Sequence, residues 1–140
     1  YVLVKNSQTK KVNIPFNYMR YKVYIAKLKR VDLKPRVVYK VGITSSSDAM
    51  DRLTYDGPDE PHPIKNYFSD IKVMKTRWMS DKNQALKLEK YIMDNIKQKE
   101  KYFHNWYEKD HISGITECRI WNYEEFKTCC HLMDSFFEKI

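Results

Sequence analysis

The sequence has few cysteines and no long apolar run, and each shortage argues against a class of protein. Its three cysteines, Cys118, Cys129 and Cys130, are an odd number that includes an adjacent pair, which does not fit the disulfide framework of a small secreted domain. No signal peptide is recognisable, and no apolar run approaches the roughly 20 residues that span a bilayer. We therefore expect a soluble intracellular protein, in the cytoplasm or nucleus, with reduced thiols and no membrane partner.

The same cysteines have one further use to consider, which is zinc binding. With His111 or His131 they offer sulfur and nitrogen ligands, although no CxxC pair provides the usual ligand spacing. The chain of 140 residues is long enough to bury a core in one domain, without internal repeats. Its first residue is Tyr1 rather than Met, as expected of a fragment or a trimmed form of a longer protein.

Positive charge is in excess. There are 26 Lys and Arg residues against 18 Asp and Glu residues, which gives a net charge of +8. Such an excess favours a polyanionic partner, because each phosphate that Lys or Arg contacts releases condensed counterions. The signal is not specific to nucleic acid. The 11 tyrosines are equally ambiguous, since they stack on bases in some proteins and fill the core in others.

Two runs of residues predict neighbouring antiparallel strands. Residues 21–28 (YKVYIAKL) alternate in polarity, and residues 37–43 (VVYKVGI) follow after the charged turn KRVDLKPR. Further strands are expected within residues 71–78 and 116–121, and residues 1–4 and 12–16 are short β-prone stretches.

Helical signals lie between and after these strands. The run SSSD at residues 45–48 supplies N-cap candidates for a short helix through Leu53. From Asp81 onward a long amphipathic helix is expected, because apolar residues recur at spacings of three and four. Its apolar stripe consists of Ala85, Leu88, Ile92 and Ile96.

The last helix is expected over residues 122–140, where Asn122 and Glu125 resemble a capping box. Its apolar stripe consists of Tyr123, Phe126, Cys130, Met133, Phe137 and Ile140. The stripe is either part of the core or a face that binds a partner. The fold class is therefore α+β, with a small antiparallel β-sheet flanked by helices in a single domain over residues 1–140.

Four side chains have positions that suit chemistry. Glu89 lies near the middle of the apolar stripe of the long helix, where a carboxylate needs either a salt bridge or a metal ion. Arg52 is either a solvated charge or a clamp for a phosphate. Tyr24 can simply pack within its strand, and Lys40 can simply face the solvent. If their strands pair, however, the ammonium can face the phenol and favour the phenolate, which accepts a proton from water.

The order of these residues resembles that of the GIY-YIG endonucleases, in particular the branch found in phage and giant-virus reading frames. Lys22-Val23-Tyr24 stands at the GIY position and Lys40-Val41-Gly42 at the YIG position. The run YKVGITSSSDAMDRL (39–53) is similar to the strand and helix that carry the family arginine, at Arg52. QALKLEKYI (84–92) is similar to the helix of the metal-binding glutamate, at Glu89, and GITECRIW (114–121) to a late family segment. The resemblance covers about residues 21–121.

The sequence departs from the family at several places, among them a hairpin that KRVDLKPR makes longer than usual. Lys22 replaces the first glycine and Lys40 replaces the tyrosine of the second motif, although some restriction-enzyme members also have lysine there. The late family asparagine has two candidates, Asn105 and Asn122.

The resemblance implies a metal-dependent DNA endonuclease. Glu89 would hold one Mg²⁺, with Mn²⁺ as a substitute, and Tyr24 would be the general base. Lys40 would favour the phenolate of Tyr24 or hold it in position, and Arg52 would stabilise the transition state. Lys40 and Arg52 would also contact the nucleic acid. The products would be a 5′-phosphate and a 3′-hydroxyl, and cutting both strands would need a dimer or two encounters.

The leading alternative function is a catalytically inactive nucleic-acid-binding module on the same scaffold. A third candidate function is a protein-interaction domain that uses the last helix.

Overall fold

A computed structural model describes residues 2–5, 11–14, 20–30, 37–45, 48–55, 57–59, 64–95 and 118–137 of the chain. The elements in this part are β1 (Val2–Lys5), β2 (Lys11–Ile14), β3 (Tyr21–Lys29), β4 (Val37–Thr44), α1 (Ala49–Leu53), a 3₁₀ helix (Ile64–Tyr67), β5 (Asp70–Met79), α2 (Lys82–Asn95), β6 (Cys118–Arg119) and α3 (Tyr123–Ser135). The predicted α+β class is confirmed. Within the described residues, no helix is long and apolar enough to cross a membrane.

The main sheet has the strand order β5-β3-β4-β6, and its three strand pairs are antiparallel. β1 and β2 form a separate two-stranded antiparallel sheet. The predicted pairing of the strands now labelled β3 and β4 is confirmed, with Tyr24 opposite Gly42 and Ala26 opposite Lys40. β3 lies between two other strands, and most of its side chains on both faces are buried.

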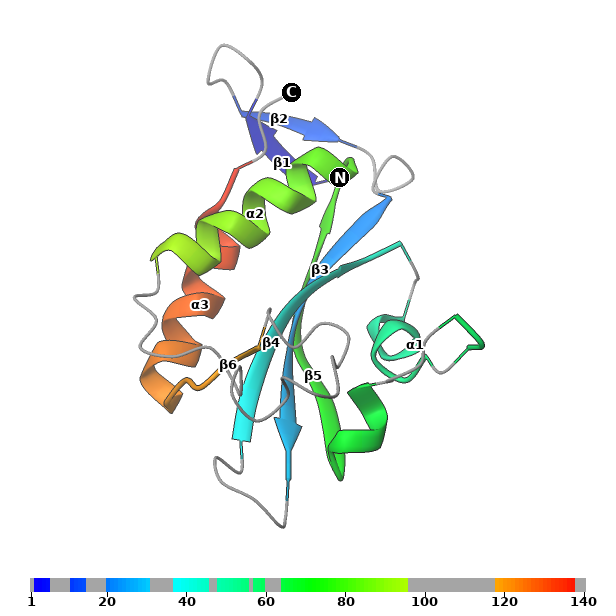
Figure 1. Ribbon diagram of the computed structural model, residues 1–140. Coiled ribbons are helices and arrows are strands. Elements are labelled where there is room, and N and C mark those ends of the chain that lie inside the picture. The colour runs from blue at the N-terminus through cyan, green and yellow to red at the C-terminus, as the bar shows by residue number, and fades with distance from the viewer. Residues whose placement is uncertain are drawn as a thin grey trace.

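Helices cover both faces of this sheet, as Figure 1 shows, with α2 and α3 on one side and α1 on the other. Val23, Ile25 and Val41 belong to the core cluster that includes the buried residues of α2 and α3. Successive side chains of a strand point to opposite faces. Tyr24 and Ala26 therefore face the other way, where they pack with Ala49 and Leu53 of α1. We call these surfaces the α2/α3 face and the α1 face.

The helix α2 begins where its sequence predicts. The side chain of Asp81 accepts a hydrogen bond of 2.8 Å from the backbone N–H of Gln84, which satisfies a donor of the first turn. Ala85, Leu88 and Ile92 are buried, so the predicted apolar stripe is confirmed at these positions. Ile96 lies outside the described residues.

The start of α3 is also as predicted, but its buried face is not. The capping box is present: Glu125 N–H donates to Asn122 Oδ1 at 2.8 Å and Asn122 N–H donates to Glu125 Oε1 at 3.1 Å. The buried residues are Phe126, Cys129 and Met133. Tyr123 is 65% exposed.

The buried face of α3 is therefore rotated about the helix axis relative to the predicted apolar stripe. Cys129 replaces Cys130 at the centre of the buried face, because the sheet and α2 contact the side of the helix defined by Phe126, Cys129 and Met133. Helix α3 ends at Ser135, so Phe137 follows the helix instead of extending its stripe. Ile140 lies outside the described residues. Phe126, Cys129 and Met133 belong to the core. Of the two interpretations of this helix, a core face or a partner-binding face, the first applies to these residues.

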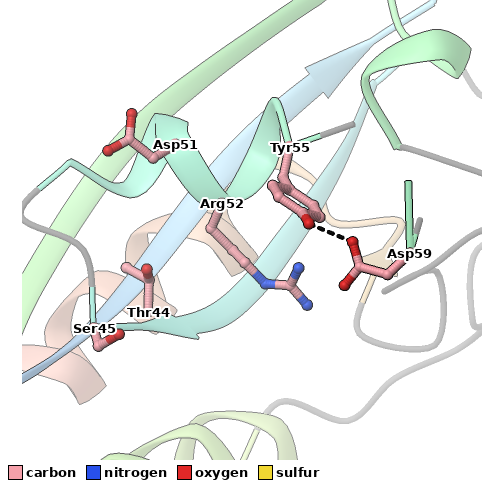
Figure 2. A pocket seen from close by; sticks show the side chains of 6 residues that line it. All are labelled: Thr44, Ser45, Asp51, Arg52, Tyr55 and Asp59. Carbon is pink, nitrogen blue, oxygen red and sulfur yellow. Dashed lines mark hydrogen bonds between the residues drawn. The ribbon is translucent and has the colours of Figure 1, made fainter. Parts of the chain in front are cut away.

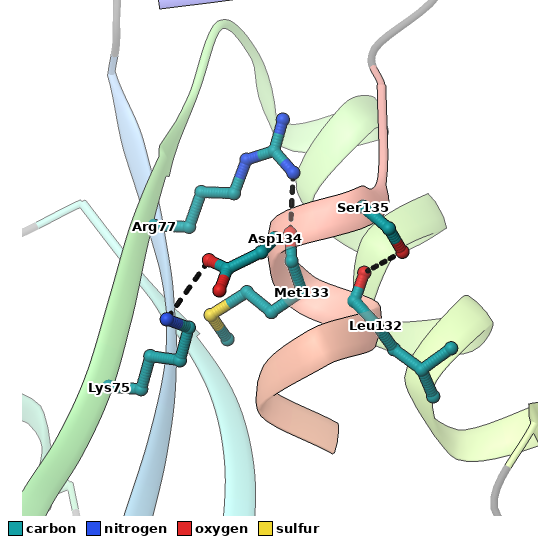
Figure 3. Close-up of polar contacts among 6 residues, drawn as sticks. All are labelled: Lys75, Arg77, Leu132, Met133, Asp134 and Ser135. Carbon is teal, nitrogen blue, oxygen red and sulfur yellow. Dashed lines mark hydrogen bonds and ion pairs between the residues drawn. The ribbon is translucent and has the colours of Figure 1, made fainter. Parts of the chain in front are cut away.

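Polar contacts join α3 to β5, more than 50 residues earlier in the chain (Figure 3). Lys75 Nζ lies 2.9 Å from the Asp134 carboxylate. The guanidinium of Arg77 donates to the carbonyl oxygen of Met133 in the last turn of α3 and lies 5.9 Å from the ring centroid of Phe136. Since carbonyls of the last helical turn lack partners within the helix, Arg77 satisfies one of them.

The strand expected at residues 116–121 is short. β6 consists of Cys118 and Arg119, which pair with Lys40 and Tyr39 of β4. Residues 116 and 117 lie outside the described residues. The ring of Tyr39 stacks on both Trp121 and Phe126, with centroid distances of 5.7 and 4.9 Å. These contacts attach the start of α3 to the sheet.

Candidate functional site

Tyr24 and Lys40 form a buried pair on the α1 face of the sheet. The Nζ atom of Lys40 donates a hydrogen bond of 3.2 Å to the phenolic oxygen of Tyr24 and lies 5.3 Å from the centroid of its ring. Tyr24 has an exposed fraction of 0% and Lys40 one of 6%. The prediction that the two side chains face each other is confirmed. The alternative reading of Lys40 as a solvent-facing residue is wrong, because both faces of the sheet are covered.

Gly42 makes room for this pair. It lies opposite Tyr24 in the strand register. A Cβ atom at Gly42 would lie 2.3 Å from Tyr24 Oη, 2.4 Å from Tyr24 Cζ and 2.8 Å from Lys40 Nζ. No side chain fits at that distance, so the tyrosine lies directly over the glycine backbone. The pair therefore requires glycine at position 42, because a side chain there would clash with both Tyr24 and Lys40.

Arg52 belongs to the short helix α1, which starts as predicted. The Asp48 side chain caps it by accepting a hydrogen bond of 2.9 Å from Met50 N–H. Ala49 and Leu53 hold the helix against the sheet, and Arg52 projects outward from it and is exposed. Arg52 is thus an exposed cation on the helix that packs against the sheet face of the buried pair.

A polar depression of about 430 Å³ surrounds Arg52. It is lined by Thr44, Ser45, Asp51, Arg52, Tyr55 and Asp59, all labelled in Figure 2. Apart from Arg52, none of these was proposed as a site residue from the sequence. Thr44, Ser45 and Asp51 lie in the run 39–53, and Tyr55 and Asp59 lie beside the predicted loop at Gly57 and Pro58.

The depression and the buried pair share one face of the sheet. Lys40, Gly42 and Thr44 are spaced by two along β4, so their side-chain positions are on the same side. Thr44 is the last residue of the strand and lines the depression. The structure therefore brings three of the four predicted residues, Tyr24, Lys40 and Arg52, to the α1 face.

Glu89 lies on a helix that packs against the opposite face of the sheet. It is half-buried, as its place in the stripe predicted, but it belongs to α2, whose buried residues pack on the α2/α3 face. β5 ends at Met79 beside Tyr21, and β4 ends at Thr44 beside Lys22. Helix α2 follows β5, so it begins at the same end of the sheet as the depression.

The fit of Glu89 to a divalent ion depends on its donor chemistry. A carboxylate oxygen suits Mg²⁺, which takes one or two protein carboxylates and completes its shell with water and phosphate oxygens. The partial exposure of Glu89 leaves access for such ligands. In the part of the chain that the structure describes, no three His, Cys, Asp or Glu side chains form a metal-binding group. A metal ion here would thus depend on Glu89 and on substrate oxygens.

The cysteines are built into the core. Cys118 and Cys129 are buried in separate clusters. Burial, followed by the neighbouring Cys130 and Glu125, raises the pKa of the Cys129 thiol to about 12. Burial also raises the pKa of Cys130, with Lys75 acting in the opposite direction. The thiols of Cys118 and Cys129 therefore pack in the core as neutral side chains. His111 lies outside the described residues.

Two positions that depart from the family pattern can also be placed. Lys22 is buried, and its Nζ atom lies 4.7 Å from the ring centroid of Trp78. Asn122 acts as the N-cap of α3, which gives it a structural role. The other candidate for the late asparagine, Asn105, lies outside the described residues.

Fold and site together define a small α+β domain with a polar, arginine-containing depression beside a buried Tyr–Lys pair. Comparison of the chain with protein-family models, curated proteins and solved structures found no match. The functional argument therefore rests on the residues themselves and on their geometry.

Proposed function

We propose that the protein is a metal-dependent DNA endonuclease that hydrolyses phosphodiester bonds in the manner of the GIY-YIG nucleases. The observation that carries this proposal is the Lys40–Tyr24 hydrogen bond of 3.2 Å on the same sheet face as the depression around Arg52. A phenol held beside an ammonium and close to an exposed guanidinium suits proton transfer next to a phosphate. The net charge of +8 is consistent with DNA as the partner.

Arg52 has the role of holding the scissile phosphate. Its planar guanidinium can donate two parallel hydrogen bonds to phosphate oxygens and stabilises the negative charge that develops in the transition state. The arginine is exposed on α1, while Ala49 and Leu53 fix the helix to the sheet. The cation is thus supported by a packed element and can still reach a ligand.

Tyr24 has the role of the general base, and Lys40 holds its phenolic oxygen in position through the hydrogen bond of 3.2 Å. This role makes a structural demand. Since Tyr24 has no exposed surface, binding of DNA at the depression must open a path for water to the phenolic oxygen. Catalytic contacts often become complete only in the substrate complex.

Glu89 is the residue that would hold Mg²⁺ or Mn²⁺. When bound, such an ion supplies positive charge to the phosphate oxygens. The products expected from this chemistry are a 5′-phosphate and a 3′-hydroxyl. With one site per chain, a monomer nicks one strand, and cutting both strands takes a dimer or two encounters. A role on DNA also places the protein in the cytoplasm or nucleus.

Two observations favour the alternative of a nucleic-acid-binding module without catalysis. Tyr24 is completely buried, and Glu89 belongs to α2, whose apolar residues pack on the α2/α3 face. A scaffold that has lost its reaction would keep the positive net charge and the exposed Arg52 while covering the tyrosine.

Nicking of supercoiled plasmid separates the two functions. The assay is run with Mg²⁺ or Mn²⁺, with EDTA, and with the variants Glu89→Ala and Arg52→Ala. Asp94→Ala is a matched control for Glu89, because Asp94 is an exposed carboxylate on the same helix paired with Lys90. Lys127→Ala, on the exposed side of α3, is the control for Arg52.

The endonuclease proposal predicts metal-dependent nicking that both site variants abolish and both controls retain. DNA binding should survive in Glu89→Ala. Equal nicking by the wild type and both site variants would exclude the assignment. Salt-sensitive binding to the plasmid without any nicking would favour the inactive binding module.

A further inference from the structure

The depression around Arg52 contains more than a phosphate site needs. We propose that it receives one unpaired nucleotide of the DNA, whose base stacks on the ring of Tyr55 while Arg52 holds the adjoining phosphate. This inference rests on the proposed interaction with DNA. It makes Tyr55 a specificity-determining residue that selects single-stranded or frayed DNA over an intact duplex.

The ring of Tyr55 is both exposed and held in place. Its exposed fraction is 41%, which makes it one of the few large apolar side chains at the surface of the described residues. Its hydroxyl donates a short hydrogen bond to the carboxylate of Asp59, drawn in Figure 2. Gly57 allows the ring to lie close to the backbone, since a Cβ atom there would be 2.2 Å from Tyr55 Oη.

An exposed aromatic ring that is held at its hydroxyl end, as Tyr55 is by Gly57 and Asp59, loses less conformational freedom than a mobile ring when a ligand stacks on it. Every nucleobase offers a flat face for such stacking. The contacts at Gly57 and Asp59 therefore suit a stacking surface better than a mobile surface tyrosine would.

The charges of the depression also match a nucleotide better than a bare phosphate. Arg52 is a cation, but Asp51 and Asp59 line the same depression, and carboxylates repel a phosphate. A nucleotide carries both an anionic phosphate and N–H donors on its base. Carboxylates accept hydrogen bonds from such donors, for example from the amino group of cytosine. In Figure 2 Arg52 extends toward the side that holds Tyr55 and Asp59, and Asp51 points away from them.

The depression is also large enough. Its volume of about 430 Å³ falls within the range of roughly 300–1,000 Å³ that is typical of small-ligand pockets. In a duplex the face of a base is covered by its neighbours and its pairing edge is occupied, so an enzyme reaches it only after it leaves the stack. DNA with an unpaired base is consequently the form that this depression fits.

The test measures binding in EDTA, so that cleavage does not enter. A labelled single-stranded oligonucleotide and the duplex of the same sequence are titrated at one salt concentration, with wild type, Tyr55→Leu and Tyr55→Phe. Tyr123→Leu is the matched control, because Tyr123 is another strongly exposed tyrosine among the described residues and lies on α3. A 2-aminopurine base in the oligonucleotide reports stacking through quenching of its fluorescence.

We expect the wild type to prefer the single strand. Tyr55→Leu should weaken single-strand binding about tenfold, the loss typical of one base–aromatic stack, and should abolish the quenching. Tyr55→Phe keeps the ring but loses the hydrogen bond to Asp59, so its affinity should lie between those of the wild type and Tyr55→Leu. Tyr123→Leu should bind nearly as the wild type does. Equal binding of single strand and duplex, or no effect of Tyr55→Leu, would overturn the inference.

The two proposals fail in different ways. Plasmid nicking that depends on Glu89 but not on Tyr55, together with unchanged single-strand binding in Tyr55→Leu, would leave the endonuclease standing and remove the nucleotide site. Single-strand binding that depends on Tyr55 without any nicking would support the nucleotide site and remove the endonuclease.

Discussion

Lys40 Nζ lies 3.2 Å from Tyr24 Oη in a buried hydrogen bond between residues 16 apart in the sequence. Antiparallel pairing of β3 with β4 creates this contact by placing Lys40 opposite Ala26, next to the Tyr24–Gly42 pair. A charged lysine in a covered face loses hydration, and only part of this loss is recovered from its partners. Such a pair contributes poorly to stability, which is consistent with a role in chemistry.

Replacement of Lys40 separates stability from activity. Lys40→Met keeps most of the side-chain volume and removes a buried charge, but it also removes the hydrogen bond to the buried Tyr24 hydroxyl. These effects oppose each other, so we expect the free energy of unfolding to change by no more than about 1–2 kcal/mol. Plasmid nicking should be lost because Tyr24 no longer has the ammonium beside it. Urea unfolding and the nicking assay measure the two effects. A loss of several kcal/mol in stability would contradict this account and assign Lys40 a structural role.

The substitution Gly42→Ala should disrupt the Tyr24–Lys40 pair and destabilise the fold. The added Cβ would meet the fully buried ring of Tyr24, and overpacking of this kind costs about 1–3 kcal/mol. Gly57→Ala is the matched control, because its Cβ meets Tyr55, which is exposed and can turn toward solvent once its hydrogen bond to Asp59 breaks, so the cost should be smaller. Urea denaturation midpoints compare the two variants.

A second substitution checks the cause of the Gly42 effect. Tyr24→Leu shortens the side chain that clashes, so the cost of Gly42→Ala should be smaller in the Tyr24→Leu background than in the wild type. Additive costs would show that the clash with the ring is not the reason.

Arg77 should be more important than Lys75 for the attachment of α3. Arg77 donates to a carbonyl of the last helical turn and lies over Phe136, so Arg77→Ala should lower the free energy of unfolding by about 1–2 kcal/mol. The Lys75–Asp134 pair is partly exposed, and removal of Lys75 should cost less than about 1 kcal/mol. Urea unfolding ranks the two variants, and amide exchange in the last turn of α3 locates the effect. Equal losses would argue against a capping role for Arg77.

Stability should fall at high pH, in part because of Cys129. Its pKa is raised from the ordinary 9.0 to about 12, mainly by burial, so the folded state holds the thiol proton more tightly than the unfolded state does. This contribution is complete below about pH 9 and is lost as the pH rises toward about 12. Cys129→Ala should therefore lose less stability than the wild type between about pH 8 and about pH 10.5. Urea midpoints at both pH values test this, and identical losses would disprove it. The raised pKa values of Tyr39 and Cys130 leave some pH dependence in the variant.

Local sequence patterns predicted most of the elements. The caps at Asp48 and Asn122 were readable because a capping side chain bonds to a backbone N–H within three residues. The stripe of α2 was readable because a helix repeats every 3.6 residues. The predicted buried face of α3 is wrong at its centre, because Cys129 and Cys130 are both compatible with an apolar stripe. Packing against the sheet and α2 determines that Cys129 is the buried residue.

Four candidate site residues could be named from the sequence, but their arrangement could not be predicted. The sequence by itself determined the α+β class, the strand pair and the presence of Tyr24, Lys40, Arg52 and Glu89 on separate elements, because these follow from local periodicity and residue order. Tertiary structure alone decided that Lys40 is buried against Tyr24, that Glu89 belongs to the helix on the other face, and that Tyr55 and Asp59 join Arg52 in one depression. The physical reason is that strand register and the choice of which helix covers which face are set by contacts between residues far apart in the chain, and no local pattern encodes them.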